Sequence, residues 1–303
     1  MYVSFAVREE DKRRLEAISP ELEFVYKEDC SAQVVIGNLP INKLPDYKNL
    51  KLIQSSAVGI DKYIRKGVLR DDTVLCNAVD IHTVEVAEHC LAMLLSMMRK
   101  FYLYRDDQKK HRWANEGIVK ELKDLKVTIV GLGNIGKHLA KQLKALGVCV
   151  IGVKRTMSEK PEYVDELYTR EDLDKAISDV DAVVAILPGN KENISFFTVD
   201  TFRKMRPDTI FINAGRGNLY TEETLRQVLD EKIIAAVASD VYATEPIPKD
   251  SPLWDYDNLI ITPHAAGSYH LESAIDAYMD LVEDNLRRYL NGEALRNVVT
   301  ERE

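Results

Sequence analysis

Short apolar runs alternate with polar, helix-patterned stretches along most of this chain. Four such runs fall in the N-terminal part, at residues 2–7, 32–38, 50–61 and 73–78. Six more, rich in β-branched residues, occupy 126–130, 148–153, 181–187, 209–214, 234–241 and 258–263. Helical spacing of apolar residues separates several of these runs. The alternation predicts an α/β protein in which a doubly wound parallel sheet of six strands is preceded by a smaller α/β domain.

The longest helical pattern covers residues 83–104 and has a wide apolar face. We expect that face to be buried, either between domains or between two copies of the chain. Another amphipathic helix lies near the C-terminus and could return to the N-terminal domain. We therefore expect a discontinuous substrate domain of residues 1–94 plus 272–303, and a second domain of residues 95–271.

The sequence GLGNIG, at residues 131–136, directly follows one expected strand and precedes a helical pattern. Its glycines permit a tight turn and a close approach of the backbone to a pyrophosphate, and the following helix presents N–H groups to that pyrophosphate. This order of strand, loop and helix predicts a Rossmann-type dinucleotide site. The residues expected to contact the dinucleotide here are Gly131, Gly133, Asn134, Ile135 and Gly136.

The next strand ends at Lys154, Arg155 and Thr156. An NAD site normally carries an Asp or Glu at this point, bonded to the ribose 2′-hydroxyl. Two cations and a hydroxyl would instead attract the dianionic 2′-phosphate of NADP. We therefore favour NADP(H) over NAD(H). The alternative is that both cations are solvated and that the protein uses NAD(H).

Candidate functional residues follow several other expected strands. In an open parallel sheet, ligands bind outside the carboxyl ends of the strands, so these positions should share one crevice. Hydride transfer needs a cationic anchor for the substrate and a group that exchanges a proton, and Arg and His supply them. The residues at these strand ends are Leu187, Pro188, Ala214, Arg216, Asp240 and His264, with Glu245 on the loop that Asp240 begins.

Six motifs, in this order, resemble those of the D-isomer-specific 2-hydroxyacid dehydrogenases. The resemblance covers essentially the whole chain and implies a Rossmann domain, a flavodoxin-like substrate domain and an NAD(P)-dependent oxidoreductase. The motifs are SSAVGID at 55–61, VAEH at 86–89, GLGNIG at 131–136, NAGRGNL at 213–219, SDVYATEP at 239–246 and TPHAAG at 262–267.

The resemblance implies a catalytic set of three residues. Arg216 would bind the carboxylate and carbonyl of the substrate, and His264 would be the acid/base. Glu245 would pair with His264, and its negative charge would favour the imidazolium form.

Further roles follow from the same resemblance. Asp240 would hold the nicotinamide amide, and Gly267 would belong to the cofactor site. Backbone N–H groups at Ala57, Val58 and Gly59 would cap the substrate carboxylate. We expect reduction of a small 2-ketoacid, either glyoxylate and hydroxypyruvate or a broader range, by a homodimer. Phosphoglycerate dehydrogenase and a non-catalytic, dinucleotide-sensing scaffold are the alternatives.

Composition sets the remaining expectations. A net charge of −8 and a pI of about 5.4 argue against a nucleic-acid partner. The longest apolar run, 91–98, is far shorter than the roughly 20 residues of a membrane span.

The four cysteines lack metal-ligand spacing, and the histidines and acids of residues 82–89 match no zinc motif, so we expect no metal. Free thiols suit a cytoplasmic location. Tyr269 and His270 either line the substrate pocket or begin a helix.

Overall fold

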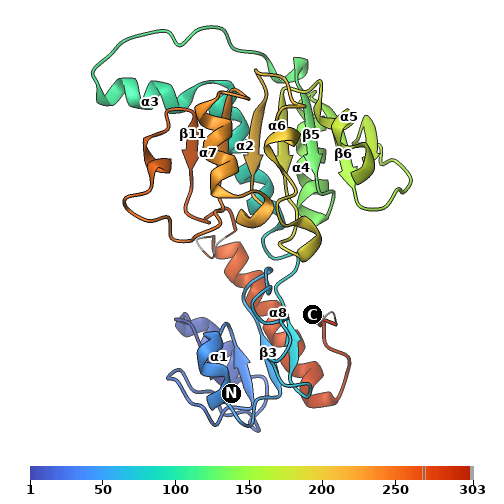
Figure 1. The fold of residues 1–303 in the computed structure, drawn as a ribbon. Helices are drawn as coiled ribbons and strands as arrows, with labels where there is room; N and C mark the ends of the chain where they lie inside the picture. The colour runs from blue at the N-terminus through green and yellow to red at the C-terminus, as the bar shows by residue number, and fades with distance from the viewer. Residues whose placement is uncertain (268, 270, 301–303) are drawn as a thin grey trace. The chain divides into compact units, whose positions relative to one another are not determined.

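The computed structural model describes residues 1–267, 269 and 271–300. It divides into two compact units, one made of Met1–His82 with Ser268–Glu303 and the other of Thr83–Gly267. Each unit has its own sheet (Figure 1). The expected boundaries, 94/95 and 271/272, lie further along the chain. The first differs because the helix α2 (Thr83–Met98) packs on α4 (Asn134–Ala145), inside the larger unit.

The larger unit contains a seven-stranded sheet in which every neighbouring pair is parallel. The strand order is β11-β10-β9-β8-β5-β6-β7, which is the doubly wound order with one extra strand, so the expected fold class is confirmed. The strands are β5 (Lys126–Val130), β6 (Cys149–Lys154), β7 (Glu166–Thr169), β8 (Ala182–Ala185), β9 (Ile210–Asn213), β10 (Ala236–Ser239) and β11 (Leu259–Ile261).

The sequence prediction of six strands missed β7. This strand lies at the edge of the sheet and pairs only with β6. None of its four residues is fully buried, so it lacks the apolar run that marks the central strands. Its position matters for the site, because register pairs Thr169 with Lys154 and brings the ends of β6 and β7 side by side.

Helices cover this sheet, and the one expected over residues 83–104 is two helices. The first, α2, ends at Met98, and Lys100 adopts a left-handed conformation (φ 58°) before the next helix begins. A left-handed residue cannot continue a right-handed helix. The buried face of α2 serves the core of its own unit. The other helices are α3 (Phe101–Lys109), α5 (Leu173–Ile177), α6 (Val199–Phe202) and α7 (Glu222–Asp230).

The smaller unit has a parallel sheet of β1 (Tyr2–Val3), β2 (Val34–Ile36), β3 (Leu52–Gln54) and β4 (Val74–Cys76), in that order. Val25 forms a parallel bridge to Tyr2 on the outer side of β1. Counting that bridge as the second strand gives the order 2-1-3-4-5, which is the flavodoxin-like order. The expected class of the smaller domain is therefore found as well.

Two helices pack in the smaller unit, α1 (Glu9–Glu16) and α8 (Glu272–Asn291). The apolar face of α8 lies in the same core as the β-strands, and Arg14 on α1 forms an ion pair with Glu283 on α8. The C-terminal helix thus belongs to the N-terminal unit. Short 3-10 helices lie at Ile41–Asp46, Leu122–Asp124, Arg170–Asp172, Lys191–Asn193, Gly217–Leu219 and Pro252–Asp255.

Two expectations concern particular segments of the chain. No helix in the described part of the chain has the length and apolar character to cross a lipid bilayer. His270 lies outside the described residues, whereas the hydroxyl of Tyr269 donates to the carbonyl of Ser56.

Candidate active site

Arg216, Asp240 and His264 follow three neighbouring strands of the larger sheet. The strands β9, β10 and β11 are adjacent and parallel, so the loops after them leave the same edge. The sequence prediction that these three residues share one edge therefore agrees with the strand order.

Glu245 and His264 form a direct pair. Oε2 of Glu245 lies 2.7 Å from Nδ1 of His264, and Oε1 accepts the backbone N–H of Tyr242 at 2.8 Å. Because a carboxylate can only accept, Nδ1 carries the proton and Nε2 is left to face a ligand. Both side chains are partly exposed, so the pair is open to a ligand. His264 itself adopts a left-handed backbone conformation, with φ 53°.

Tyr242 anchors the loop that carries Glu245. Its side chain is buried, and its hydroxyl donates to the carbonyl of Ser239 at the end of β10. Burial raises the pKa of Tyr242 well above its ordinary value, so the phenol stays protonated as a donor. The backbone N–H that fixes Glu245 is thus held by the sheet.

The carboxylate of Asp240 is the centre of the loop at 262–266. Oδ1 accepts the hydroxyl of Thr262 at 2.6 Å and the N–H of Ala265 at 2.9 Å, and Oδ2 accepts the N–H of Ala266 at 3.0 Å. The backbone N–H of His264 donates to the carbonyl of the same aspartate at 2.8 Å. Asp240 is 1% exposed. A role in holding the nicotinamide amide stays a prediction, and its structural role is to shape the loop of His264.

The loop of Arg216 passes very close to the loop of Glu245. A Cβ added at Gly217 would lie 2.0 Å from the backbone of Tyr242, so only glycine fits there. Nη1 of Arg216 donates to the carbonyl of Gly215 at 2.8 Å, and Nδ2 of Asn213 donates to the carbonyl of Arg216 at 3.1 Å. Arg216 is therefore held on both its main chain and its side chain.

The glycine loop fits a diphosphate. A Cβ at Gly136 would lie 2.1 Å from the carbonyl oxygen of Gly131, which lets α4 start close to β5. A Cβ at Gly133 would meet no atom within 4 Å, so this side of the loop is open. The N–H groups of Ile135 and Gly136, at the start of α4, have no acceptor among the described residues. Unpaired N–H groups at a helix N-terminus are the usual partners of phosphate.

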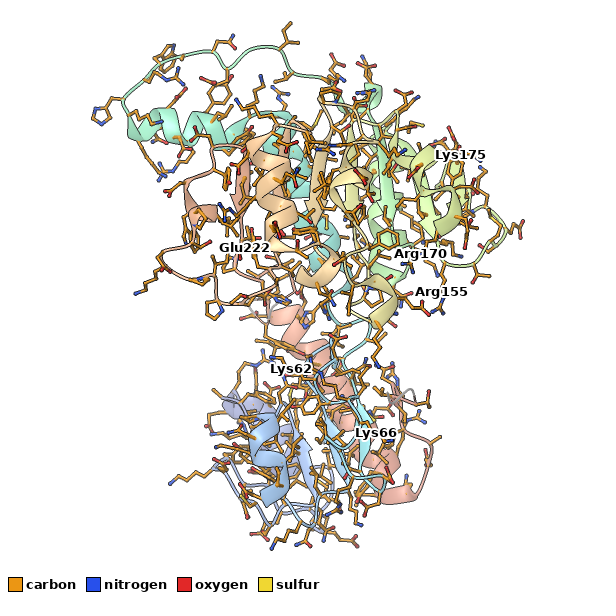
Figure 2. All side chains as sticks on the ribbon, in the orientation of Figure 1. Lys62, Lys66, Arg155, Arg170, Lys175 and Glu222 are labelled. Carbon is orange, nitrogen blue, oxygen red and sulfur yellow. The ribbon has the colours of Figure 1, made fainter. Side chains whose placement is uncertain are left out.

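The end of β6 presents cations. Nζ of Lys154 donates to Oγ of Ser158 at 2.8 Å, whereas Arg155 is largely exposed and lies 3.9 Å from the carboxylate of Glu192. Arg170 directly follows β7, whose last residue, Thr169, pairs with Lys154 at the end of β6 (Figure 2 labels Arg155 and Arg170). Thr156, the next residue after Arg155, is exposed. The strand end where a ribose-binding acid would be expected therefore carries positive charge.

Asparagines fix the loop of Leu187 and Pro188, and sequence reasoning missed them. Nδ2 of Asn193 donates to the carbonyl of Pro188 at 2.9 Å, and Nδ2 of Asn218 donates to the carbonyl of Gly189 at 3.0 Å. The second bond ties this loop to the loop of Arg216. Ala214 directly follows β9, and Gly267 is the last residue of the larger unit. A role of either residue in binding the cofactor stays a prediction.

The loop at residues 55–59, in the smaller unit, has its carbonyls engaged and two N–H groups available. The carbonyl of Ala57 accepts the N–H of Ala78 at 3.0 Å, and the carbonyl of Val58 accepts Nδ2 of Asn77 at 3.2 Å. The N–H groups of Val58 and Gly59 donate to no group within the part of the chain that is described. Two neighbouring free N–H groups form a site suited to an anion.

Asn38 holds this loop from β2 and was not found from the sequence. Its Oδ1 accepts the hydroxyl of Ser55 at 2.7 Å, and its Nδ2 donates to the hydroxyl of Ser56 at 2.9 Å. The hydroxyl of Ser55 in turn accepts the N–H of Ala57 at 3.0 Å. These bonds fix the first half of the loop and so the direction of the N–H groups that follow.

Acidic, cysteine and histidine side chains do not gather into a metal-binding group of three or more among residues 1–267, 269 and 271–300. The histidines and acids at the start of α2 are included in that statement.

Comparison with known proteins shows the family of this chain. The family model for the D-isomer specific 2-hydroxyacid dehydrogenase, NAD binding domain, matches residues 91–266, more than half of the chain. A D-3-phosphoglycerate dehydrogenase of Archaeoglobus fulgidus is 31% identical over 83% of this chain. The chain spans about half of that relative, 47% of its length.

Two solved structures resemble the whole chain. A D-isomer specific 2-hydroxyacid dehydrogenase family protein from Aeromonas salmonicida superposes with a TM-score of 0.87 at 29% identity, covering 98% of this chain and 97% of that one. An NADPH-dependent glyoxylate/hydroxypyruvate reductase from Sinorhizobium meliloti, in complex with NADP and sulfate, gives a TM-score of 0.84 at 27% identity over 99% and 98% of the two chains. This chain therefore belongs to the D-isomer-specific 2-hydroxyacid dehydrogenase family and is an NAD(P)-dependent oxidoreductase.

Proposed function

We propose that this protein is an NADP(H)-dependent 2-ketoacid reductase that yields D-2-hydroxyacids. The observation that carries the proposal is the pair of Glu245 and His264, with Nε2 of the imidazole left for a ligand. Glu245 lies on the loop after β10, the strand next to β9, which the loop of Arg216 follows. A cationic fork and an oriented imidazole are the two groups that reduction of a 2-ketoacid requires.

Arg216, His264 and Glu245 each have a different role in the proposed reaction. A nicotinamide cofactor, when bound, supplies the hydride that reaches the carbonyl carbon. The guanidinium of Arg216 holds the substrate carboxylate and polarises the carbonyl. Nε2 of His264 gives its proton to the carbonyl oxygen, and Glu245 keeps the imidazole oriented through Nδ1. In the oxidising direction, neutral His264 takes the proton back.

For the smaller unit taken by itself, we propose the loop of Ala57, Val58 and Gly59 as a loop that binds a carboxylate. The free N–H groups of Val58 and Gly59 support this assignment, because they form a donor pair with no internal acceptor. The carbonyls of Ala57 and Val58 are already engaged, so neither is free to repel an anion. The substrate class is therefore a small acid, with glyoxylate and hydroxypyruvate as first candidates and broader 2-ketoacids as the next.

The preference for NADP(H) is supported by the charge at the end of β6. Lys154, Arg155 and Thr156 offer two cations and a hydroxyl to a 2′-phosphate. The glycine loop and the strand-end residues 187, 188, 214, 240 and 267 are assigned to the rest of the cofactor.

The test is a panel of 2-ketoacids assayed with NADPH and with NADH, followed by the loss of NAD(P)H absorbance. We expect turnover of glyoxylate or hydroxypyruvate and a higher kcat/KM with NADPH than with NADH. An equal or higher kcat/KM with NADH would refute the cofactor preference. Tight binding of NADPH without turnover of any acid would instead favour the dinucleotide-sensing scaffold.

A second candidate substrate carries an additional anionic group, as in phosphoglycerate dehydrogenase chemistry. The exposed side chains of Lys62, Arg65 and Lys66 follow the loop of Gly59 directly, and none forms an ion pair with an acid among the described residues (Figure 2 labels the two lysines). Unpaired cations beside a carboxylate site suit a phosphate or a second carboxylate.

The double variant Lys62→Ala/Lys66→Ala separates the two substrate classes. If the substrate is phosphorylated, its kcat/KM should fall at least tenfold while that for glyoxylate changes less than twofold. Equal small changes for both substrates would assign these lysines to the solvated surface. Phosphohydroxypyruvate therefore belongs in the panel.

We further propose that the protein is a homodimer that uses the arm formed by α3 and residues 110–121. Figure 1 shows this arm leaving the body of its unit. Trp113 and Ile118 on it are almost fully exposed, and Phe101 is mostly exposed. Exposed large apolar side chains on one segment mark an interaction surface. Light scattering should give twice the chain mass, and Trp113→Glu/Ile118→Glu should give the monomer; a wild-type monomer would refute the proposal.

A cytoplasmic location completes the proposal. It is supported by the four cysteines, all of which are free thiols. Fractionation of the producing cells, with the protein detected by antibody, tests it.

A further inference from the structure

A chain of hydrogen bonds runs from α2 into the loop of His264. Nε2 of His89 lies 3.1 Å from Oγ1 of Thr262, and the hydroxyl of Thr262 lies 2.6 Å from Oδ1 of Asp240. A carboxylate can only accept, so the hydroxyl proton of Thr262 points to Asp240. The hydroxyl oxygen then accepts from His89, which must carry its proton on Nε2.

Asp240 connects these hydrogen bonds to the loop that carries His264. The same Oδ1 that binds Thr262 also accepts the N–H of Ala265, and Oδ2 accepts the N–H of Ala266. These two N–H groups directly follow His264, whose left-handed backbone depends on the loop being held. Three donors thus fix a carboxylate that is 1% exposed, and His89 orients one of those donors.

The imidazole of His89 also lies close to the carboxylate of Asp240 itself. Among the described residues, the basic side chain nearest to the carboxylate of Asp240 is that of His89, whose Nε2 lies 3.7 Å from Oδ1. The neighbour Cys90 contributes no charge, because burial, with a smaller effect from Asp240, raises the pKa of its thiol to about 12. Within the described residues of α2, His89 is the side chain that lies within ion-pair distance of the buried carboxylate.

We propose that His89 is a positioning residue of the reaction, which acts through Thr262 and Asp240 on the placement of His264. The proposal rests on the proposed function of His264 as the acid/base. The His89 side chain is 24% exposed, and its hydrogen bond among the described residues is the one to Thr262. If His89 only filled space on α2, an apolar side chain of similar size could replace it. If His89 positions the loop, its replacement must also donate a hydrogen bond.

Two substitutions separate the roles. His89→Leu keeps bulk and removes the donor, whereas His89→Gln keeps an N–H at a similar reach. We expect kcat to fall about tenfold in His89→Leu, the size of one lost hydrogen bond, with KM for the ketoacid within twofold of wild type. His89→Gln should recover most of the rate. Glu88→Ala, at the exposed neighbouring position, is the matched control and should leave kcat unchanged.

A second background tests the route through Thr262. Thr262→Val removes the hydroxyl that joins His89 to Asp240. In that background, adding His89→Leu should change kcat less than twofold, because the link is already absent. A full tenfold loss in the double variant would show that His89 acts by another route and would overturn the proposal.

A readout without turnover keeps the proposal separate from the proposed function. Hydrogen exchange of residues 262–267, followed by mass spectrometry on the full chain, reports the bonds from Ala265 and Ala266 to Asp240. We expect exchange about tenfold faster in His89→Leu and near wild type in His89→Gln. Wild-type exchange in His89→Leu would overturn the inference even if the enzyme is active. Faster exchange in a protein that reduces no 2-ketoacid would leave the positioning of the loop intact and would refute only the proposed reaction.

Discussion

Glu245 holds His264 by one oxygen and its own loop by the other. Oε2 lies 2.7 Å from Nδ1 of the imidazole, and Oε1 accepts the N–H of Tyr242 at 2.8 Å. The carboxylate is therefore fixed before any ligand arrives, and it fixes the tautomer of the histidine. An imidazole that is already oriented loses little freedom when it exchanges a proton with a substrate.

Removing either partner should lower the rate to different extents. His264→Ala should reduce kcat by about a hundredfold to ten-thousandfold, the range for a lost acid/base. Glu245→Gln keeps the bond to Tyr242 and loses the charge, so we expect a smaller loss of about ten- to a hundredfold. Steady-state kinetics with the best ketoacid measure both, and Glu223→Gln in the exposed first turn of α7 is the control. An unchanged kcat in His264→Ala would remove the mechanism.

Reversing the charge at the end of β6 should reverse the cofactor preference. Arg155→Asp places a carboxylate where a ribose 2′-hydroxyl would be bound and a 2′-phosphate repelled. We expect kcat/KM for NADPH to fall at least tenfold and that for NADH to rise. Lys175→Asp, an exposed change of the same sign on α5, should alter neither. A variant at 155 that still prefers NADPH would contradict the assignment.

Neutralising Glu192 should act in the opposite direction. Its carboxylate lies 3.9 Å from the guanidinium of Arg155 and competes with a phosphate for that charge. An exposed ion pair contributes little, so Glu192→Gln should raise kcat/KM for NADPH by about two- to fivefold and leave that for NADH unchanged. An equal rise in kcat/KM with both cofactors would indicate that Glu192 affects the conformation of its loop and does not compete with the 2′-phosphate for Arg155.

Asp181 should contribute stability that depends on pH. Burial alone would raise its pKa, but hydrogen bonds from Lys120, the N–H of Lys126 and Arg206 outweigh burial and leave the pKa below its ordinary value. A carboxyl with a lowered folded-state pKa adds stability above its unfolded-state pKa of about 4 and loses it as the pH falls through the folded value.

The corresponding variant is Asp181→Asn. We expect it to cost about 1–3 kcal/mol at pH 7, and the difference from wild type to shrink below about pH 4. Thermal unfolding at several pH values measures this difference. Asp179→Asn, on an exposed side chain of the same charge cluster, should cost less at every pH. A deficit that grew on acidification would have the wrong sign.

The cysteines should differ widely in reactivity. Burial raises the pKa of both Cys76 and Cys90 to about 12, so neither holds an appreciable fraction of thiolate at pH 8, whereas Cys30 is exposed. A thiol reagent should label Cys30 first in the native protein, and Cys76 and Cys90 only after unfolding. Peptide mass spectrometry identifies the order, and rapid native labelling of Cys90 would contradict the burial of α2.

Much of the larger unit could be predicted because its signals are local. The strands at its centre are buried on both faces and read as apolar runs. The motif GLGNIG directly follows one of them, and Gly136 is required by the nearby carbonyl of Gly131. The edge of the sheet at which Arg216, Asp240 and His264 gather follows from parallel connectivity alone.

The parts that could not be predicted depend on contacts between distant segments. β7 is a strand only because β6 offers it a partner, and the helix after residue 83 stops at a left-handed Lys100 that no Gly or Pro announces. Asn38 and Asn193 hold loops through bonds to backbone carbonyls or hydroxyls, which leave no pattern in the sequence. Polar side chains of this kind become recognisable only once their partners have positions.

The left-handed backbone of His264 has a consequence for attempts to raise the stability of this protein. A histidine at φ 53° is less comfortable than Gly or Asn would be, by roughly 1 kcal/mol. A library screened for heat resistance alone would therefore favour Gly or Asn at this position and would discard the acid/base. If His264 is the acid/base that we propose, a thermostable variant of this enzyme should be sought with position 264 held constant.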